Sequence, residues 1–298
     1  MTMKQVVTVE GRTLQLSSLD KVFWPKLGLT KADLLDYHVR MAPYTIPYWQ
    51  NRPLTVTRYP DGVEGEFFYQ KNKPMSTPSW VETYFVNDTE HVLANNLSTI
   101  TWLVNQGSIE FHPATYVQSN PEVPSFAIID LDPTPPLGFN EAVEAAKWCN
   151  ELLSKLGLLG YPKTSGGSGL HIYIPLLLVY DFQISSGLVR LLGQILHELY
   201  PRKITLERLV KNRQGVYVDY LQNLANKTIV GVYSPRPSPE ATVSTPIRWN
   251  DLDHVRPEDF TIRTVPQWVK QMGDLFYPAS QDVQSLEHLL ATFKNIPH

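Results

Sequence analysis

Three aspartates are the residues of this sequence that point most directly to chemistry. Asp130 and Asp132 stand two residues apart at the end of an apolar run, and Asp219 follows the run Val216-Tyr217-Val218. Residues i and i+2 of a strand face the same side, so Asp130 and Asp132 can direct their oxygens at one point. Carboxylate oxygens suit hard divalent cations, and three carboxylates can hold two ions about 4 Å apart. The aspartates therefore predict a two-metal site for an in-line displacement.

A glycine-rich segment, Ser165-Gly166-Gly167-Ser168-Gly169-Leu170-His171, lies between the aspartate pair and Asp219. In one interpretation its backbone N–H groups and the Ser165 hydroxyl surround a phosphate group. In the other it is an ordinary glycine turn between two strands, and His171 is satisfied within the sheet. Because the glycine-rich segment follows the predicted metal ligands in the sequence, we favour the first interpretation, in which the segment binds a phosphate group.

Composition indicates an ordinary globular protein, since 43% of the 298 residues are hydrophobic and 18% are charged. No apolar run approaches the roughly 20 residues that span a bilayer, and the N-terminus lacks the apolar core of a signal peptide. We therefore expect a cytoplasmic protein without a membrane partner. A single cysteine, Cys149, excludes an internal disulfide and a cysteine-based zinc site, and is expected to be a small buried helix residue.

The distribution of charge suggests a nucleic-acid substrate, although the net charge is −3. Residues 163–236 carry 9 Lys and Arg against 4 Asp and Glu, whereas residues 76–162 carry 2 against 10. A basic track beside an acidic metal pocket suits a phosphate backbone. The alternative is a pair of solvated faces with uneven charge.

The elements that position these residues are predicted to be strands and long helices in a non-alternating order, which indicates an α+β or mixed α/β fold with helices covering central strands. Period-2 and period-3.6 patterns predict strands over 6–9, 14–17, 54–59, 109–112, 125–131, 170–175, 216–221 and 228–232. They predict helices over 97–104, 139–156, 184–199 and 287–293, and a helix that begins at Thr30 with a capping box closed by Asp33.

Taken in order, the aspartate pair, the glycine-rich segment and Asp219 resemble the three motifs of the archaeo-eukaryotic primase superfamily. The sequence is most similar to the polymerase domain of bacterial DNA ligase D, which acts in non-homologous end joining. Further matching stretches are residues 19–25, 51–53, 65–68, 110–112, 218–223 and 233–236. The resemblance implies a primase-like catalytic core with central β-sheets flanked by helices. It also implies one primase-polymerase domain over 1–298, with a part that binds DNA ends and template to about residue 120 and the catalytic core from about 121.

The resemblance implies a template-directed nucleotidyltransferase, a DNA-dependent RNA/DNA polymerase that fills gaps and extends ends in double-strand-break repair. Asp130, Asp132 and Asp219 would be catalytic and would hold two Mn²⁺ or Mg²⁺ ions. The substrates would be NTPs or dNTPs and gapped or broken DNA with a 5′-phosphate. The expected partners are Ku and a DNA ligase domain or protein, and the expected location is the nucleoid.

The resemblance also implies roles for individual side chains. Nucleotide binding falls to His112, Ser165, Gly167, Ser168, His171 and Arg236. DNA binding falls to Lys21 and Lys31 at the 5′-phosphate, Phe67 and Phe68 at the template, Arg213 at the DNA terminus, and Arg58. Many relatives have Lys where this chain has Ser168, which removes a phosphate-binding charge, and Lys163 is a candidate to replace it.

Two other functions fit parts of the pattern. Residues 128–134 match the first motif of haloacid-dehalogenase-like phosphatases, in which Asp130 would be the nucleophile and Asp132 an acid/base. That family needs a late pair of acidic metal ligands, for which Asp251 and Asp253 are the candidates. A non-catalytic module that binds DNA ends would explain the basic segments but would leave the three aspartates without a role.

Overall fold

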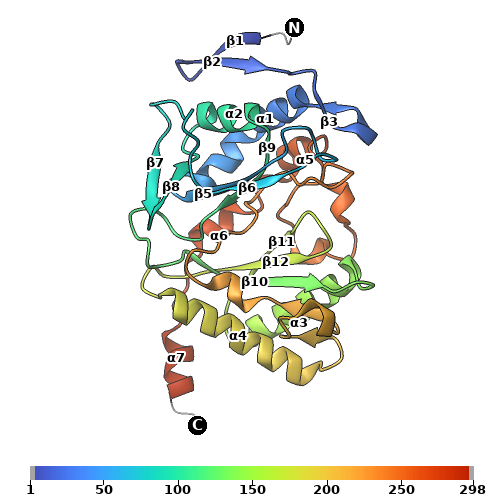
Figure 1. Cartoon of the computed structure of the whole chain (residues 1–298). Helices are drawn as coiled ribbons and strands as arrows, with labels where there is room; N and C mark the ends of the chain where they lie inside the picture. The colour runs from blue at the N-terminus through green and yellow to red at the C-terminus, as the bar shows by residue number, and fades with distance from the viewer. Residues whose placement is uncertain (1–3, 295–298) are drawn as a thin grey trace. The chain divides into compact units, whose positions relative to one another are not determined.

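The chain folds into two compact units in the computed structural model, which describes residues 4–294 (Figure 1). Unit 1 contains the chain up to residue 119 together with 228–245 and 256–274, and unit 2 contains 120–227, 246–255 and the chain from 275 onward. One boundary between the units lies between residues 119 and 120, and the segments 228–245 and 256–274 return to unit 1. The assignment of a DNA-binding part and a catalytic core to these regions stays a prediction. No helix within residues 4–294 is long and apolar enough to cross a membrane.

Unit 1 is built around an antiparallel sheet whose central strand is β5 (Pro53–Arg58). Strand β5 pairs with β6 (Phe68–Gln70), β8 (Thr89–Leu93) and β9 (Ser108–Pro113), and β7 (Thr83–Val86) pairs with β8. Thr57 of β5 lies opposite Glu110 on one side and Tyr69 on the other. Directly opposed residues share a face, so these three side chains form one row across the sheet.

Helices α1 (Lys31–Trp49) and α2 (Leu97–Asn105) pack together in unit 1. Helix α1 begins with the predicted capping box of Thr30 and Asp33. Trp49, at the end of α1, stacks on Phe111 of β9 with ring centroids 4.9 Å apart, so helix and sheet share a core. The other strands of unit 1 are β1 (Lys4–Val9), β2 (Arg12–Ser17), β3 (Val22–Trp24) and β4 (Leu29–Thr30).

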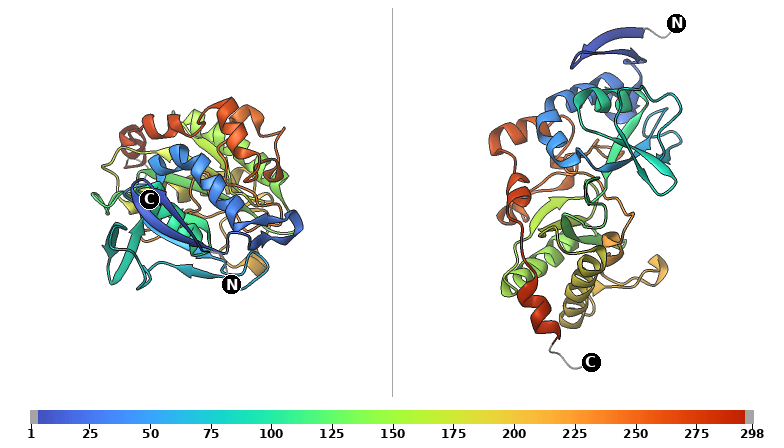
Figure 2. Two further views of the ribbon diagram at one scale, coloured as in Figure 1. Left: turned by 90° about the horizontal axis from the view of Figure 1, so that it is seen from above. Right: turned by 90° about the vertical axis from the view of Figure 1, so that its left-hand side faces the viewer.

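Unit 2 has a five-stranded sheet with the order β11, β12, β10, β14, β13. The strands are β10 (Phe126–Pro133), β11 (Tyr161–Thr164), β12 (Leu170–Pro175), β13 (Ile204–Thr205) and β14 (Val216–Val218), and only the β13–β14 pair is parallel. Helices α3 (Phe139–Lys155) and α4 (Phe182–Leu199) pack on this sheet, as Figures 1 and 2 show. Cys149 is buried in α3, as predicted.

The predicted strand over 228–232 is wrong, because this stretch forms only an isolated bridge between Thr228 and Ala114. The backbone instead approaches β9 edge-on, and the Gly231 N–H donates to the Phe111 carbonyl at 2.8 Å. A Cβ at Gly231 would lie 2.6 Å from Nε1 of Trp49, so the close approach requires glycine.

The predicted strand over 216–221 ends early, at Val218. Asp219 caps the 3₁₀ turn η3 (Tyr220–Asn223) by accepting a hydrogen bond from the Leu221 N–H. The other helices are α5 (Val265–Met272), α6 (Tyr277–Gln281) and α7 (Glu287–Lys294), and the remaining 3₁₀ turns are η1 (Pro25–Leu27), η2 (Val210–Asn212), η4 (Trp249–Asp251) and η5 (Pro257–Asp259).

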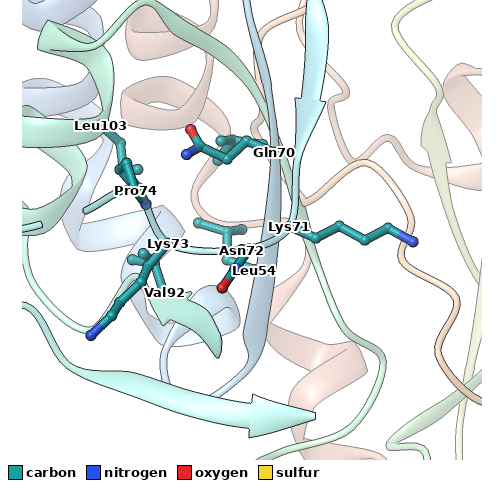
Figure 3. A pocket seen from close by; sticks show the side chains of 9 residues that line it. Leu54, Gln70, Lys71, Asn72, Lys73, Pro74, Val92 and Leu103 are labelled. Carbon is teal, nitrogen blue, oxygen red and sulfur yellow. The ribbon is translucent and has the colours of Figure 1, made fainter. Parts of the chain in front are cut away.

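A small cavity lies under the loop that follows β6 in unit 1 (Figure 3). Its volume of about 10 Å³ is at the lower limit for a single water molecule. Lys71 and Lys73 extend from this loop in Figure 3, and Lys73 reaches Glu90 at 2.8 Å. The cavity is thus a packing gap under a basic loop and has no room for a ligand.

Candidate active site

The three predicted aspartates lie at one place on the sheet of unit 2. Asp130 of β10 lies opposite His171 of β12. On its other side Asp219 continues the β10–β14 register, and the Asp219 N–H donates to the Asp130 carbonyl at 3.0 Å. His171, Asp130 and Asp219 therefore form a row across three neighbouring strands, which we call the carboxylate row. Asp132 follows two residues after Asp130 and is again less buried than its neighbours, as the i, i+2 spacing predicts.

Each residue of the carboxylate row has a polar atom that is already engaged. Nε2 of His171 lies 3.4 Å from Oδ1 of Asp130, and His171 is only 4% exposed. Oδ1 of Asp219 accepts hydrogen bonds from the Leu221 N–H and the Tyr217 hydroxyl at 3.0 and 3.2 Å. These contacts fix the direction of both carboxylates without covering them.

Asp132 is the most exposed of the three aspartates, with 54% of its side chain accessible, and it is paired with Arg213 at 3.2 Å. The Arg213 guanidinium also lies 3.7 Å from the centre of the Tyr217 ring and donates to the carbonyls of Glu207 and Arg208. Burial raises the pKa of Asp132, as does the negative charge of Asp219, while Arg213 opposes the rise. The negative charges of Asp132 and Asp219 therefore repel each other, and a bound cation would reduce this repulsion.

The donor chemistry at this place fits divalent metal ions, because three carboxylates from adjacent strands face one side of the sheet. The ligands are not preassembled, since no group of three His, Cys, Asp or Glu residues in the described part of the chain is gathered closely enough to hold an ion. Asp132 would first have to exchange its contact with Arg213 for an ion. The assignment of these three residues as metal ligands stays a prediction.

The glycine-rich turn between β11 and β12 is organised around Ser165. Its hydroxyl oxygen accepts hydrogen bonds from the backbone N–H groups of Gly167 and Gly169 at 3.1 and 3.2 Å. A Cβ at Gly169 would lie 2.6 Å from the Leu131 carbonyl oxygen, so this glycine lets the turn pack against β10. Lys163 is fully buried, with its Nζ over the ring of Tyr173 at 5.6 Å, and therefore does not replace the missing positive charge at Ser168.

A second polar group lies in unit 1 and joins the predicted residues His112 and Arg236. Glu110 contacts Arg236 Nη1 at 2.9 Å through Oε1 and His112 Nε2 at 3.7 Å through Oε2. The Thr57 hydroxyl lies 3.4 Å from the same His112 nitrogen. We call Glu110, His112, Arg236 and Thr57 the Glu110 cluster. Sequence reasoning missed Glu110 and Thr57, although Glu110 and His112 have the same i, i+2 strand spacing as the aspartate pair.

The two phenylalanines predicted at the template have different surroundings. Phe67 stacks on Tyr59 with ring centroids 5.2 Å apart and meets Tyr69 edge-on at 6.1 Å, and Tyr69 meets the His112 ring at 6.4 Å. Phe67 therefore extends the Glu110 cluster as an aromatic surface, 53% exposed. Phe68 pairs in register with Arg58, whose guanidinium lies 5.2 Å from its ring, so it belongs to the opposite face of the strand.

Lys21 and Lys31 interact electrostatically, but the Lys21 side chain is partly exposed whereas that of Lys31 is buried. Lys21 Nζ lies 2.5 Å from Asp61. Lys31 is 4% exposed, and its Nζ donates to the carbonyl and side-chain oxygens of Asn105 at 3.0 and 3.1 Å. Burial lowers the pKa of Lys31 to about 8, with a further contribution from the charge of Lys21.

Comparison with known proteins decides which family carries these features. The model of the LigD primase-polymerase domain family matches residues 30–276. The chain is 36% identical over 286 residues to the bifunctional non-homologous end joining protein LigD of Bacillus subtilis, covering 93% of this chain and 46% of that protein. It is 31% identical to the multifunctional LigD of Mycolicibacterium smegmatis, covering 93% of this chain and 37% of that protein.

The chain belongs to the LigD primase-polymerase domain family. The polymerase domain of Mycobacterium tuberculosis ligase D, solved in complex with DNA, superposes with a TM-score of 0.84 at 29% identity, covering 91% of this chain and 99% of that one. These matches confirm the predicted family, the primase-like mixed α/β fold and the enzyme class of nucleotidyltransferase. They do not favour the phosphatase or the non-catalytic alternative. The chain spans less than half the length of these curated relatives.

Proposed function

We propose that this chain is a template-directed nucleotidyltransferase that fills gaps and extends DNA ends during end joining. The observation that carries the proposal is the carboxylate row with Asp132 beside it, held on adjacent strands of a fold that matches a DNA-bound polymerase domain. Neutral or apolar side chains would fill this edge of the sheet at a lower desolvation cost, so the concentration of carboxylates indicates cation binding.

Asp130, Asp132 and Asp219 would hold two divalent ions, Mn²⁺ or Mg²⁺. When bound, such a pair supplies charge stabilisation at the attacking and leaving oxygens of an in-line displacement. The protein contributes orientation: His171 holds Asp130, and Tyr217 with the η3 backbone holds Asp219. Arg213 keeps Asp132 in place in the absence of an ion.

Nucleotide binding is assigned to two sets of side chains, one in each unit. The turn in unit 2 provides Ser165, Gly167, Ser168 and His171, and Ser165 acts mainly by shaping the turn. In unit 1 the guanidinium of Arg236 provides a planar fork that suits phosphate oxygens, with His112 beside it. Arg236 is the proposed cationic contact of unit 1 for phosphate oxygens, and Ser168 of unit 2 contributes no charge.

DNA binding is assigned to unit 1 and to the loop of Arg213. Phe67 offers an exposed aromatic face to an unpaired template base. Lys21, with Lys31 behind it, would bind a 5′-phosphate, and Arg58 supports the strand beneath Phe68. We assign contact with a DNA terminus to Arg213 in the segment between β13 and β14, a segment that Figure 2 shows extending away from the helices of unit 2. Ku and a DNA ligase domain are the proposed protein partners.

The decisive experiment is nucleotide incorporation on a labelled duplex that contains a short gap with a 5′-phosphate, assayed with Mn²⁺ or Mg²⁺. We expect template-dependent extension of the primer strand by the wild-type chain. Binding to the gapped duplex without extension would favour the end-binding module instead. Release of phosphate from a simple monoester, again without extension, would favour the phosphatase.

A further inference from the structure

Glu110 is a buried carboxylate in the middle of the β9–β5–β6 face of unit 1. It is 4% exposed and lies opposite Thr57, whose hydroxyl is among its hydrogen-bond partners. Burying an ionised carboxylate is costly unless its charge and its lone pairs are matched. Glu110 meets this condition through two different side chains, and both of them are assigned to the nucleotide.

Each carboxylate oxygen of Glu110 faces one of these side chains. Oε1 accepts from Arg236 at 2.9 Å, and Oε2 faces Nε2 of His112 at 3.7 Å. Burial by itself would raise the pKa of Glu110, but the nearby His112 and the charge of Arg236 bring it below the usual value. Glu110 is therefore ionised at neutral pH and supplies a fixed negative charge behind the two groups.

The backbone that carries Arg236 is anchored independently of Glu110. The Phe111 N–H donates to the Ser234 hydroxyl at 2.9 Å, and the Arg236 N–H donates to the Thr242 carbonyl at 2.8 Å. Loss of the Glu110 carboxylate would leave these bonds in place. What Glu110 adds is the direction of the long and flexible Arg236 side chain, which is 28% exposed.

We propose that Glu110 is a positioning residue that holds the side chains of Arg236 and His112 in the orientation that binds the phosphate groups of the incoming nucleotide. This inference rests on the proposed function. A buried ion pair contributes little to the net stability of a fold because desolvation is costly, but it can fix the orientation of the two side chains that form it. Immobilising Arg236 before the nucleotide arrives reduces the entropy lost on binding.

Charge and orientation predict opposite effects of removing Glu110. Loss of a negative charge near a triphosphate would by itself strengthen nucleotide binding. Loss of the orientation of Arg236 and His112 would weaken it. Replacement by alanine removes the carboxylate entirely, whereas replacement by glutamine keeps the shape and one acceptor oxygen for Arg236. The pair of variants therefore separates the two explanations.

The experiment measures the Kd for ATP with Mg²⁺ in the absence of DNA, and separately KM and kcat for nucleotide incorporation. We expect Glu110→Ala to raise both Kd and the nucleotide KM on the order of tenfold, the usual size for a lost charge-assisted contact, with kcat changed much less. Glu110→Gln should recover most of the affinity. In an Arg236→Ala background, Glu110→Ala should cost less than about threefold, because residues that act as one unit are not additive.

Glu90→Ala is the matched control, since Glu90 pairs with Lys73 at 2.8 Å in the same sheet, and it should leave Kd and KM unchanged. Unchanged or tighter ATP binding by Glu110→Ala would overturn the proposal, as would a full tenfold loss in the Arg236→Ala background or a wild-type chain that binds no ATP. A lower melting temperature with unaltered Kd would show a structural role only and would also overturn it. If the wild-type chain binds ATP but does not extend DNA, the polymerase function fails while the Kd values still judge Glu110.

Discussion

The Asp130–Asp132 pair of unit 2 and the Glu110–His112 pair of unit 1 share one local arrangement, two polar residues at i and i+2 of a strand with a buried residue between them. They differ in how the charge is treated. Asp132 is 54% exposed and pairs with the loop residue Arg213, whereas the Glu110 side chain is 6% exposed and shared between Arg236 and His112.

Because of this difference in burial, the aspartates of unit 2 are suited to binding cations, whereas the Glu110 cluster holds a cationic side chain that is suited to binding phosphate. Carboxylates that repel each other at a partly exposed place at the end of the central strand β10 are ready for a cation. A carboxylate that is buried and already neutralised cannot bind an ion, but it can hold a guanidinium facing outward. The same spacing thus serves cation binding in unit 2 and phosphate binding in unit 1, depending on burial.

The largest expected effect is on the accessible carboxylates. Asp130→Ala or Asp132→Ala should reduce incorporation to background while DNA binding stays within a few-fold, because metal ligands act on the reacting centre and contribute little to backbone affinity. Glu144→Gln removes an exposed carboxylate that pairs with Lys203 in unit 2 and serves as the control. Extension at the wild-type rate by either aspartate variant would remove the metal assignment and break the comparison.

The next effect concerns the groups that the Glu110 cluster presents. Arg236→Ala and His112→Ala should each raise the nucleotide KM on the order of tenfold, equivalent to about 1.5–3 kcal/mol for a charge-assisted contact. Arg236→Lys should recover only part of the loss, because an ammonium is a point charge without the planar fork. Titrations with DNA should be unchanged, and a defect confined to DNA affinity would move both residues to the DNA-binding surface.

A third test reaches the core behind the Glu110 cluster. His38 is 1% exposed and packs against Phe111 at 4.9 Å, and neither of its ring nitrogens has a hydrogen-bond partner among the described residues. Burial lowers its pKa to about 3. In the unfolded chain His38 binds a proton below about pH 6.5, whereas in the folded chain it does so only below about pH 3. The free energy of unfolding therefore falls as pH decreases between these two values.

Each pH unit in this window should cost up to about 1.4 kcal/mol per proton. Denaturant unfolding of His38→Phe at several pH values should show a shallower loss of stability toward acid than the wild type, whatever its absolute stability. Replacement of the exposed His254 by alanine is the control and should leave the slope as it is in the wild type. Identical slopes for His38→Phe and wild type would mean that His38 is protonated inside the fold.

The aspartate pair could be predicted from the sequence because its geometry is local: a strand imposes the common face, and burial of the intervening residue follows from the apolar run. The meeting of Asp219 with Asp130 is not local; the sequence grouped these residues by their chemistry and by the resemblance to a family, and no pattern within either strand shows that the strands are neighbours. Glu110 has the i, i+2 spacing to His112 and lies in a stretch that matches the family, but neither signal assigned it a role. Its partner Arg236 lies in a segment that approaches β9 closely at Gly231. No pattern in this segment or in β9 predicts the contact between Arg236 and Glu110.

The same reason explains the errors among the elements. The stretch over 228–232 has β-branched residues, but its backbone follows β9 through a glycine contact and does not form a ladder. Lys31 is buried against Asn105 at the end of α2. Lysines are normally exposed, so this burial could not be predicted from the sequence. Local patterns predicted α2, α3, α4, α7 and the start of α1 well, whereas tertiary contacts decided the conformation of 228–232 and the burial of Lys31.

The smallest expected effect tests whether Lys31 binds DNA phosphate, as an accessible charge would, or only contacts Asn105 within the fold. The wild-type chain should bind a gapped duplex a few-fold more tightly when the downstream strand has a 5′-phosphate, because Lys21 and Lys31 add positive charge to that segment. A base is charged below its pKa, so the preference should shrink as pH rises through about 8, where Lys31 loses its proton in the free protein. Added salt should also weaken it, since exposed charges are screened beyond about 8 Å at physiological ionic strength.

Paired binding curves for phosphorylated and unphosphorylated duplexes, recorded between pH 7 and 9 at fixed salt, measure this preference. The double variant Lys21→Ala, Lys31→Ala should lose the preference yet extend an ungapped primer-template almost as well as the wild type, whereas the exposed Lys270→Ala control should keep it. Lys21→Ala alone separates the two lysines: a preference that survives this change but still fades through pH 8 would assign the phosphate to Lys31, which would then have to leave Asn105. Equal wild-type affinities for both duplexes would reject a 5′-phosphate site in unit 1 while leaving the carboxylate row and its chemistry untouched.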